Sequence, residues 1–128
     1  MLKGKPLADF TPISDTISEI QIIDIKEGDG AVVAEGATIT AHYTGAYVVN
    51  GVVFESSKDS GQPATFPLSG VIQGWQNGVP GMKVGGVRRL VIPGAQAYGE
   101  APEGYNPGDG GRPMGPLVFD IELQSIGQ

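Results

Sequence analysis

The chain has 128 residues, of which 40% are hydrophobic and 17% charged, and its formal net charge at pH 7 is −6. This length fits one domain with its own hydrophobic core. The acidic balance argues against nucleic acid or an anionic membrane as a partner. The absence of cysteine excludes disulfides, thiol nucleophiles and thiolate metal sites.

The N-terminal part of the chain differs from the rest. Residues 1–19 show no periodicity and contain glycine and proline, so we expect an extended arm, followed by a single domain over residues 20–128. Three apolar residues of the arm are candidates for docking on this domain: Leu7, Phe10 and Ile13. The arm lacks the apolar segment of a secretory signal, and no stretch is long enough to span a bilayer. We therefore expect a cytoplasmic protein, with export left open if a leader has been removed.

Short segments of β-branched and alternating residues predict an antiparallel sheet of about five strands. The last segment is the clearest, because its apolar and polar residues alternate strictly. Asn50-Gly51 predicts a tight hairpin turn between two of the segments. The expected strand segments are residues 20–25, 37–49, 52–55, 65–68 (a short edge strand), 87–92 and 117–126.

Only residues 71–79 are expected to form a helix, because their apolar residues, Trp75 among them, fall on one stripe. Gly74 and Gly78 each cost a helix about 1 kcal/mol relative to alanine, so tertiary packing must hold this segment. One short helix on an antiparallel sheet defines an α+β fold. Residues 93–116 are rich in glycine and proline and predict a long surface loop.

The sequence offers little for metal or nucleophilic chemistry. His42 is the only histidine, and without cysteine it cannot build a closed metal site, so we expect neither metal nor cofactor. No phosphate-binding loop or dinucleotide fingerprint occurs. A serine nucleophile (Ser56, Ser57 or Ser69) would need His42 as its base and is a minor alternative. The aromatic residues fit either a core or an apolar pocket with hydroxyl groups at its rim.

Six ordered motifs over about residues 20–126 strongly resemble the FKBP-type peptidyl-prolyl cis/trans isomerases. They are His42-Tyr43-Thr44-Gly45, Val52-Val53-Phe54-Glu55-Ser56-Ser57, Val71-Ile72-Gln73-Gly74-Trp75, Gly81-Met82-Lys83-Val84-Gly85-Gly86, Ala97-Tyr98-Gly99 and Leu117-Val118-Phe119-Asp120-Ile121-Glu122-Leu123. The resemblance implies a half-barrel sheet wrapped around one short helix, with an apolar pocket between them for a proline ring.

The resemblance also implies the residues of this site. Trp75 would form the pocket floor, Tyr98 would donate its hydroxyl to a substrate carbonyl, and the Ile72 N–H would be a second donor. The implied catalytic residues are Tyr43, Phe54, Glu55, Trp75, Tyr98 and Phe119, and the implied substrate-binding residues are Phe66, Val71, Ile72 and Tyr105.

The implied activity requires no metal, cofactor or covalent intermediate. The cis and trans forms of an X-Pro bond differ by roughly 0.5–1 kcal/mol and are separated by a resonance barrier of about 18–20 kcal/mol. An apolar pocket favours the twisted amide, because that form has lost its resonance charge separation, while fixed donors hold the flanking carbonyls. The expected substrates are proline-containing peptide segments, preferably with an apolar residue X.

Two departures from the family pattern motivate an alternative function. Glu55 stands where the family most often has Asp, and the loop over residues 100–116 carries Gly111-Arg112-Pro113-Met114 in place of the common apolar residues. The alternative is a proline-recognising binding or chaperone module with little turnover. The family also implies macrolide immunosuppressants as ligands, and we expect a monomer that binds neither nucleic acid nor membrane.

Overall fold

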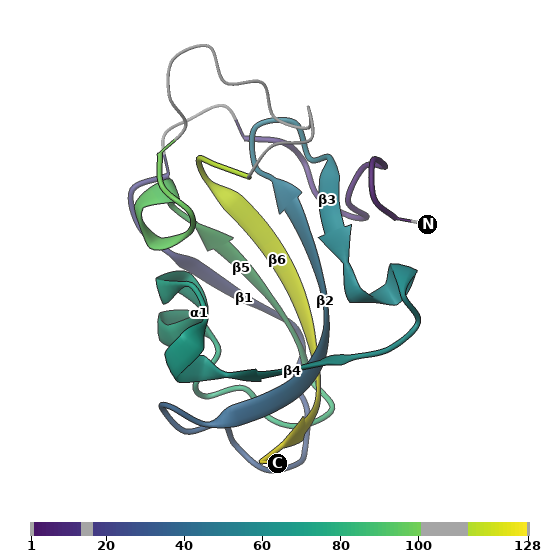
Figure 1. Ribbon diagram of the computed structural model, residues 1–128, viewed down its shortest axis with the longest axis vertical. Helices are drawn as coiled ribbons and strands as arrows, with labels where there is room; N and C mark the ends of the chain where they lie inside the picture. The colour runs from purple at the N-terminus through teal and green to yellow at the C-terminus, as the bar shows by residue number, and fades with distance from the viewer. Residues whose placement is uncertain (1, 14–16, 101–112, 128) are drawn as a thin grey trace.

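The computed structural model describes residues 2–13, 17–100 and 113–127. In this part of the chain a six-stranded antiparallel sheet packs one face against a single short α-helix (Figure 1). The strand order is β1-β5-β6-β2-β3, and β4 pairs separately with β2. The elements are β1 (Gln21–Lys26), β2 (Thr38–Tyr47), β3 (Val53–Ser56), β4 (Ala64–Pro67), α1 (Gln73–Gly78), β5 (Val87–Ile92) and β6 (Leu117–Ile126).

The predicted α+β class is confirmed, and each strand falls where the sequence pattern placed it. The sheet has six strands rather than about five, because two short strands share one side of β2. β4 pairs with residues 38–41 of β2, and β3 pairs with residues 44–46. His42 and Tyr43 lie between these two ladders, at a point where only β6 pairs with β2.

The inner face of the sheet and α1 enclose the main core. Alternate residues of β6 point into it, as the sequence predicted for this strand. The buried residues of this core are Val33, Ile39, Ala41, Tyr47, Leu68, Trp75, Val79, Met82, Leu90, Ile92, Leu117, Phe119, Ile121 and Leu123.

The helix is shorter than predicted, since α1 begins at Gln73 rather than at Val71. Val71 is extended (φ −109°, ψ 175°), and Ile72 is the N-cap residue with ψ 153°. At its other end the Arg88 guanidinium donates a hydrogen bond to the Gly78 carbonyl at 2.8 Å. This bond satisfies a carbonyl that has no partner within the helix.

The N-terminal segment packs on the outer face of the sheet. The Gly4 N–H donates to the Val53 carbonyl at 2.8 Å, and the Val53 N–H donates to the Lys5 carbonyl at 2.9 Å, so the segment continues the sheet beyond β3. Leu7 is buried in a second core, and Phe10 and Ile13 pack against it, which confirms the expected docking. The other buried residues of this second core are Ala46, Val48, Val53, Val91 and Val118.

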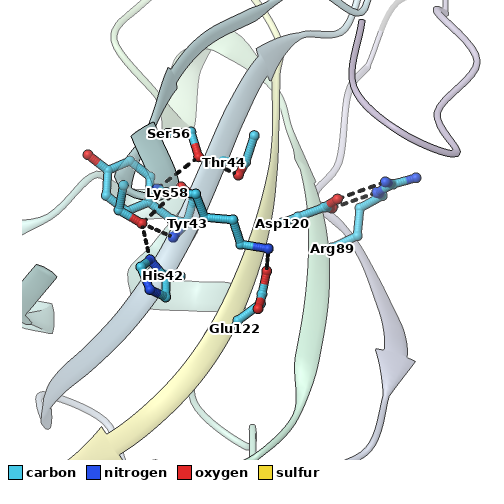
Figure 2. Close-up of polar contacts among 9 residues, drawn as sticks. His42, Tyr43, Thr44, Ser56, Lys58, Arg89, Asp120 and Glu122 are labelled. Atoms are coloured by element: carbon cyan, nitrogen blue, oxygen red, sulfur yellow. Dashed lines mark hydrogen bonds and ion pairs between the residues drawn. The ribbon is translucent and has the colours of Figure 1, made fainter. Parts of the chain in front are cut away.

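One arginine ties this segment to the middle of the sheet. Arg89 of β5 forms two hydrogen bonds with the Asp120 carboxylate, at 2.7 and 2.8 Å (Figure 2). The same guanidinium donates to the carbonyls of Ala8 and Asp9 at 2.9 and 2.8 Å. Its central carbon also lies 5.6 Å from the centre of the Phe10 ring, within the range of a cation–π contact.

Candidate functional site

A pocket of about 250 Å³ opens between α1 and the inner face of the sheet. Strands β2, β3, β4 and β6, the start of the helix and the segment after β5 each contribute residues to its walls. The lining residues are Tyr43, Glu55, Phe66, Gly70, Val71, Ile72, Trp75, Tyr98 and Phe119.

Trp75 forms the floor of this pocket, since it lines the cavity although only 4% of its surface is exposed. Three aromatic rings meet the indole edge-on: Phe66 at 5.2 Å, Phe119 at 5.4 Å and Tyr43 at 5.7 Å between ring centres. Such pairs each contribute roughly 0.5–1.5 kcal/mol beyond the area they bury. The floor is therefore held by partners from three different strands.

Tyr43 and Glu55 form the polar side of the pocket. Burial, the charge of Glu55 and a hydrogen bond to its carboxylate raise the pKa of Tyr43 to about 12. The phenol is therefore protonated at neutral pH and donates to Glu55. Glu55 therefore reaches the pocket tyrosine and pairs with its hydroxyl.

Tyr98 and Ile72 supply the other polar groups. Tyr98 follows the 3₁₀ turn Gly94–Gln96 and is 40% exposed at the pocket mouth. Ile72 is the N-cap residue of α1, and the N–H of a residue in this position makes no intrahelical hydrogen bond. The pocket thus combines an aromatic floor with donors on more than one side.

The structure brings most of the predicted site residues together, with two exceptions. Phe54 is not among the lining residues; its ring supports Phe119 edge-on at 5.8 Å and lies 5.3 Å from the Tyr47 ring. Tyr105 lies outside the residues that the structure describes. Gly70, which ends the 3₁₀ turn Leu68–Gly70, lines the pocket although it was not predicted to; its position directly before Val71-Ile72 was the available signal.

Ser57 and His42 are close together, but not as a catalytic pair. The His42 Nδ1 lies 2.9 Å from the Ser57 Oγ. However, this hydroxyl is buried and also bonded to the backbone of Tyr43, and neither residue lines the pocket. Among residues 2–13, 17–100 and 113–127, no group of three or more His, Cys, Asp or Glu side chains is placed to hold a metal.

Comparison with protein families gives a match over most of the chain. A model of the FKBP-type peptidyl-prolyl cis-trans isomerases matches residues 30–124. A probable FK506-binding protein from Corynebacterium glutamicum is 46% identical over 114 residues, which cover 89% of this chain and 92% of that protein. An FK506-binding protein from Streptomyces anulatus is 40% identical over 127 residues, covering 95% and 97% of the two chains.

Solved structures agree with these relatives. The crystal structure of FkpA from Escherichia coli superposes with a TM-score of 0.72 at 35% identity, over 88% of this chain and 51% of that one. The chain thus spans about half the length of FkpA. The crystal structure of AtFKBP13 gives a TM-score of 0.68 at 37% identity, over 88% and 96% of the two chains. In the part of the chain that is described, no helix is long and apolar enough to cross a membrane.

Proposed function

Because the chain belongs to the FKBP-type peptidyl-prolyl cis-trans isomerase family, we propose that its aromatic pocket is where it binds a proline ring and catalyses rotation about the X-Pro bond. The single observation that carries this assignment is the Trp75 floor, surrounded edge-on by Tyr43, Phe66 and Phe119. A pocket of about 250 Å³ with these walls fits one apolar ring of a peptide.

Catalysis rests on the difference between planar and twisted amide. The barrier of about 18–20 kcal/mol comes from amide resonance, which gives the planar form its charge separation. The twisted amide has lost that separation and is tolerated better by apolar walls. Interactions that are stronger with the twisted form than with the planar form lower the barrier.

The polar groups of the pocket fix the peptide on either side of the rotating bond. The Tyr98 hydroxyl and the Ile72 N–H donate hydrogen bonds to carbonyls that flank the proline. Two fixed carbonyls allow the bond between them to turn while the ends of the peptide stay in place. The phenol of Tyr43, held by Glu55, completes the wall beside the ring.

The alternative function, a proline-recognising binding or chaperone module with little turnover, has less support once the position of Glu55 is known. It rested on Glu55 and on the loop over residues 100–116. Glu55 keeps a hydrogen bond with Tyr43, and residues 101–112 lie outside the described part of the chain. The isomerase therefore accounts for the site best.

The substrates, the further ligands and the oligomeric state of the protein are also proposals. We propose proline-containing segments of client proteins as substrates, with an apolar X residue, because the lining around the floor is mainly apolar. FK506-like macrolides are proposed as further ligands, which is supported by the names of two relatives. We further propose that the chain acts as a monomer, because a formal net charge of −6 on one small domain disfavours association between copies.

The test uses the single tryptophan of the chain as a probe. Titration with a short apolar-X-Pro-Phe peptide is expected to change the fluorescence of Trp75, whereas the same peptide with alanine in place of proline leaves it unchanged. Equal responses to both peptides would contradict proline recognition at this floor. Exchange NMR on the same peptide then tests turnover.

A further inference from the structure

The backbone of Tyr43 lies at the point where one side of β2 changes its pairing partner from β4 to β3. On one side β2 is paired along its length with β6, and Tyr43 stands opposite Ile121. On the other side the β4 ladder ends at Ala41 and the β3 ladder ends at Thr44. The N–H and C=O of one residue in an antiparallel strand point to the same side, so both groups of Tyr43 need partners in this gap.

The Ser57 hydroxyl supplies both partners. Ser57 begins the 3₁₀ turn Ser57–Asp59, directly after β3. Its Oγ accepts a hydrogen bond from the Tyr43 N–H at 2.8 Å and donates to the Tyr43 C=O at 3.3 Å. The side chain thus replaces the next rung of the β2–β3 ladder. Figure 2 shows the contacts that meet at Tyr43 and His42.

His42 completes this network. A hydroxyl has one hydrogen to donate and two acceptor positions. The hydrogen serves the Tyr43 carbonyl and one acceptor position serves the Tyr43 N–H. The second acceptor position is left for the His42 Nδ1 at 2.9 Å, and in this arrangement we expect the neutral imidazole to carry its hydrogen on Nδ1. The opposite tautomer would take the hydroxyl hydrogen away from the Tyr43 carbonyl.

We propose that Ser57 is a positioning residue for the isomerase site, acting through Tyr43 and Glu55. This inference rests on the proposed function of the pocket. Glu55 lies on β3, two residues before Ser57 at the start of the following turn, and its carboxylate accepts a hydrogen bond from the Tyr43 phenol. The Ser57 hydroxyl thus holds the Tyr43 backbone against the chain segment that carries Glu55, and the side chains of Tyr43 and Glu55 meet at the pocket wall. Small displacements of such groups affect turnover more than ground-state binding.

Ser56 provides a matched control. Ser56 and Ser57 are each 7% exposed, and each joins the end of β3 to β2 through its hydroxyl. The Ser56 Oγ bonds to the Thr44 hydroxyl at 2.8 Å and accepts from the Lys58 N–H at 3.2 Å (Figure 2). Among the residues that the structure describes, the Ser56 hydroxyl makes no hydrogen bond to Tyr43. Ser56→Ala therefore shows how much turnover is lost when a buried serine hydroxyl at this end of β3 is removed without any change in the contacts of Tyr43.

The experiment compares Ser57→Ala, Ser57→Thr and Ser56→Ala with the unaltered protein. We expect Ser57→Ala to lower kcat/KM for an X-Pro-Phe peptide roughly 10-fold, while peptide affinity from Trp75 fluorescence changes less than about 3-fold. Ser57→Thr keeps the hydroxyl and is expected to recover most of the turnover. Ser56→Ala is expected to stay within about 2-fold of the unaltered protein. Equal turnover in Ser57→Ala and Ser56→Ala would overturn the proposal.

A measurement on the unaltered protein tests the network without any variant. His42 is the single histidine, so its ring ¹⁵N signals are unambiguous at a pH where the imidazole is neutral. We expect the hydrogen on Nδ1, together with slow exchange of the Tyr43 amide. The opposite tautomer or an unprotected Tyr43 amide would contradict the network. Absence of turnover in the unaltered protein would contradict the proposed function itself, and with it this positioning role.

Discussion

Gly74 of α1 lies so close to Ile92 of β5 that a Cβ atom on Gly74 would stand 2.5 Å from the Ile92 Cγ2. One turn later, a Cβ atom on Gly78 would stand 2.7 Å from the Leu90 Cδ2. The two glycines therefore let the helix backbone rest directly on β5. This close approach sets the depth of Trp75, the floor of the pocket.

Replacement of Gly74 by alanine is expected to destabilise the fold. Helix propensity favours alanine by about 1 kcal/mol, but the added methyl group overlaps a buried isoleucine, and overpacking typically costs about 1–3 kcal/mol. The net change in the free energy of unfolding, from urea denaturation, is expected to be a loss. Gly70→Ala is the control, since a Cβ there would meet only the Pro67 Cγ, at 3.6 Å. A stabilised Gly74→Ala protein would contradict the close-packing account.

The N-terminal segment is expected to contribute to the stability of the domain. Leu7 is 7% exposed, whereas Leu2 is 37% exposed. Truncation of a buried leucine costs about 2–5 kcal/mol, and exposed positions stay within about 0.5 kcal/mol. Leu7→Ala should therefore lower the thermal midpoint clearly and Leu2→Ala should not. Equal midpoints for the two variants would show that the packed segment adds nothing to stability.

The Tyr43 phenol is expected to lose its proton only at high pH, and part of the increase in its pKa depends on Glu55. Burial is the largest cause of its raised pKa of about 12, followed by the charge of Glu55. Glu55→Gln should lower this pKa toward the ordinary value of 10.0 without reaching it, because the burial remains. NMR titration of the Tyr43 ring carbon measures the change. An unaltered pKa in Glu55→Gln would contradict the contact.

The same shift has a consequence for stability at high pH. A group whose pKa is raised on folding contributes stability that is full below its unfolded pKa and is lost as the pH rises through its folded pKa. For Tyr43 this window runs from 10.0 to about 12. The difference in unfolding free energy between the unaltered protein and Tyr43→Phe should shrink across this range. A constant difference would contradict the linkage.

Substitutions of Phe119 and Trp75 are expected to have different effects, the first on the stability of the fold and the second on peptide affinity. Phe119 is buried and meets both Trp75 and Phe54, so Phe119→Ala should cost about 3–5 kcal/mol of unfolding free energy. Trp75→Leu keeps an apolar floor for the fold but removes the aromatic surface, so peptide affinity should fall. Calorimetry replaces fluorescence here, because the variant has no tryptophan. Unchanged affinity in folded Trp75→Leu would contradict the assignment of the floor.

Much of the fold could be predicted because the local signals agreed with the tertiary structure. The alternation in residues 117–126 predicted β6 with its bounds, since one face of that strand enters the core. The helix was predicted two residues too early, because Val71 and Ile72 share the apolar stripe although their backbone is extended. The periodicity shows that the apolar side chains lie on one face, but it does not show where the first helical hydrogen bond forms.

The site was predicted by resemblance more than by local pattern. Its lining residues come from distant parts of the chain, and only the motif order joined them before the structure was known. The role of Ser57 could not be predicted, because it depends on where the β4 and β3 ladders end along β2. The exposure of β1 could not be predicted either, because a run of β-branched residues indicates a strand but not whether its side chains are covered; Ile25 is 53% exposed.

The central claim is tested most directly by exchange NMR on a short apolar-X-Pro-Phe peptide with catalytic amounts of the protein. The account predicts faster cis/trans exchange than in peptide alone, and a loss of that acceleration in Tyr98→Phe, which removes a hydroxyl at the pocket mouth. Acceleration by the unaltered protein that Tyr98→Phe retains in full would contradict the role of this donor. A folded protein that leaves the exchange rate unchanged would contradict the assignment of the pocket as an isomerase site.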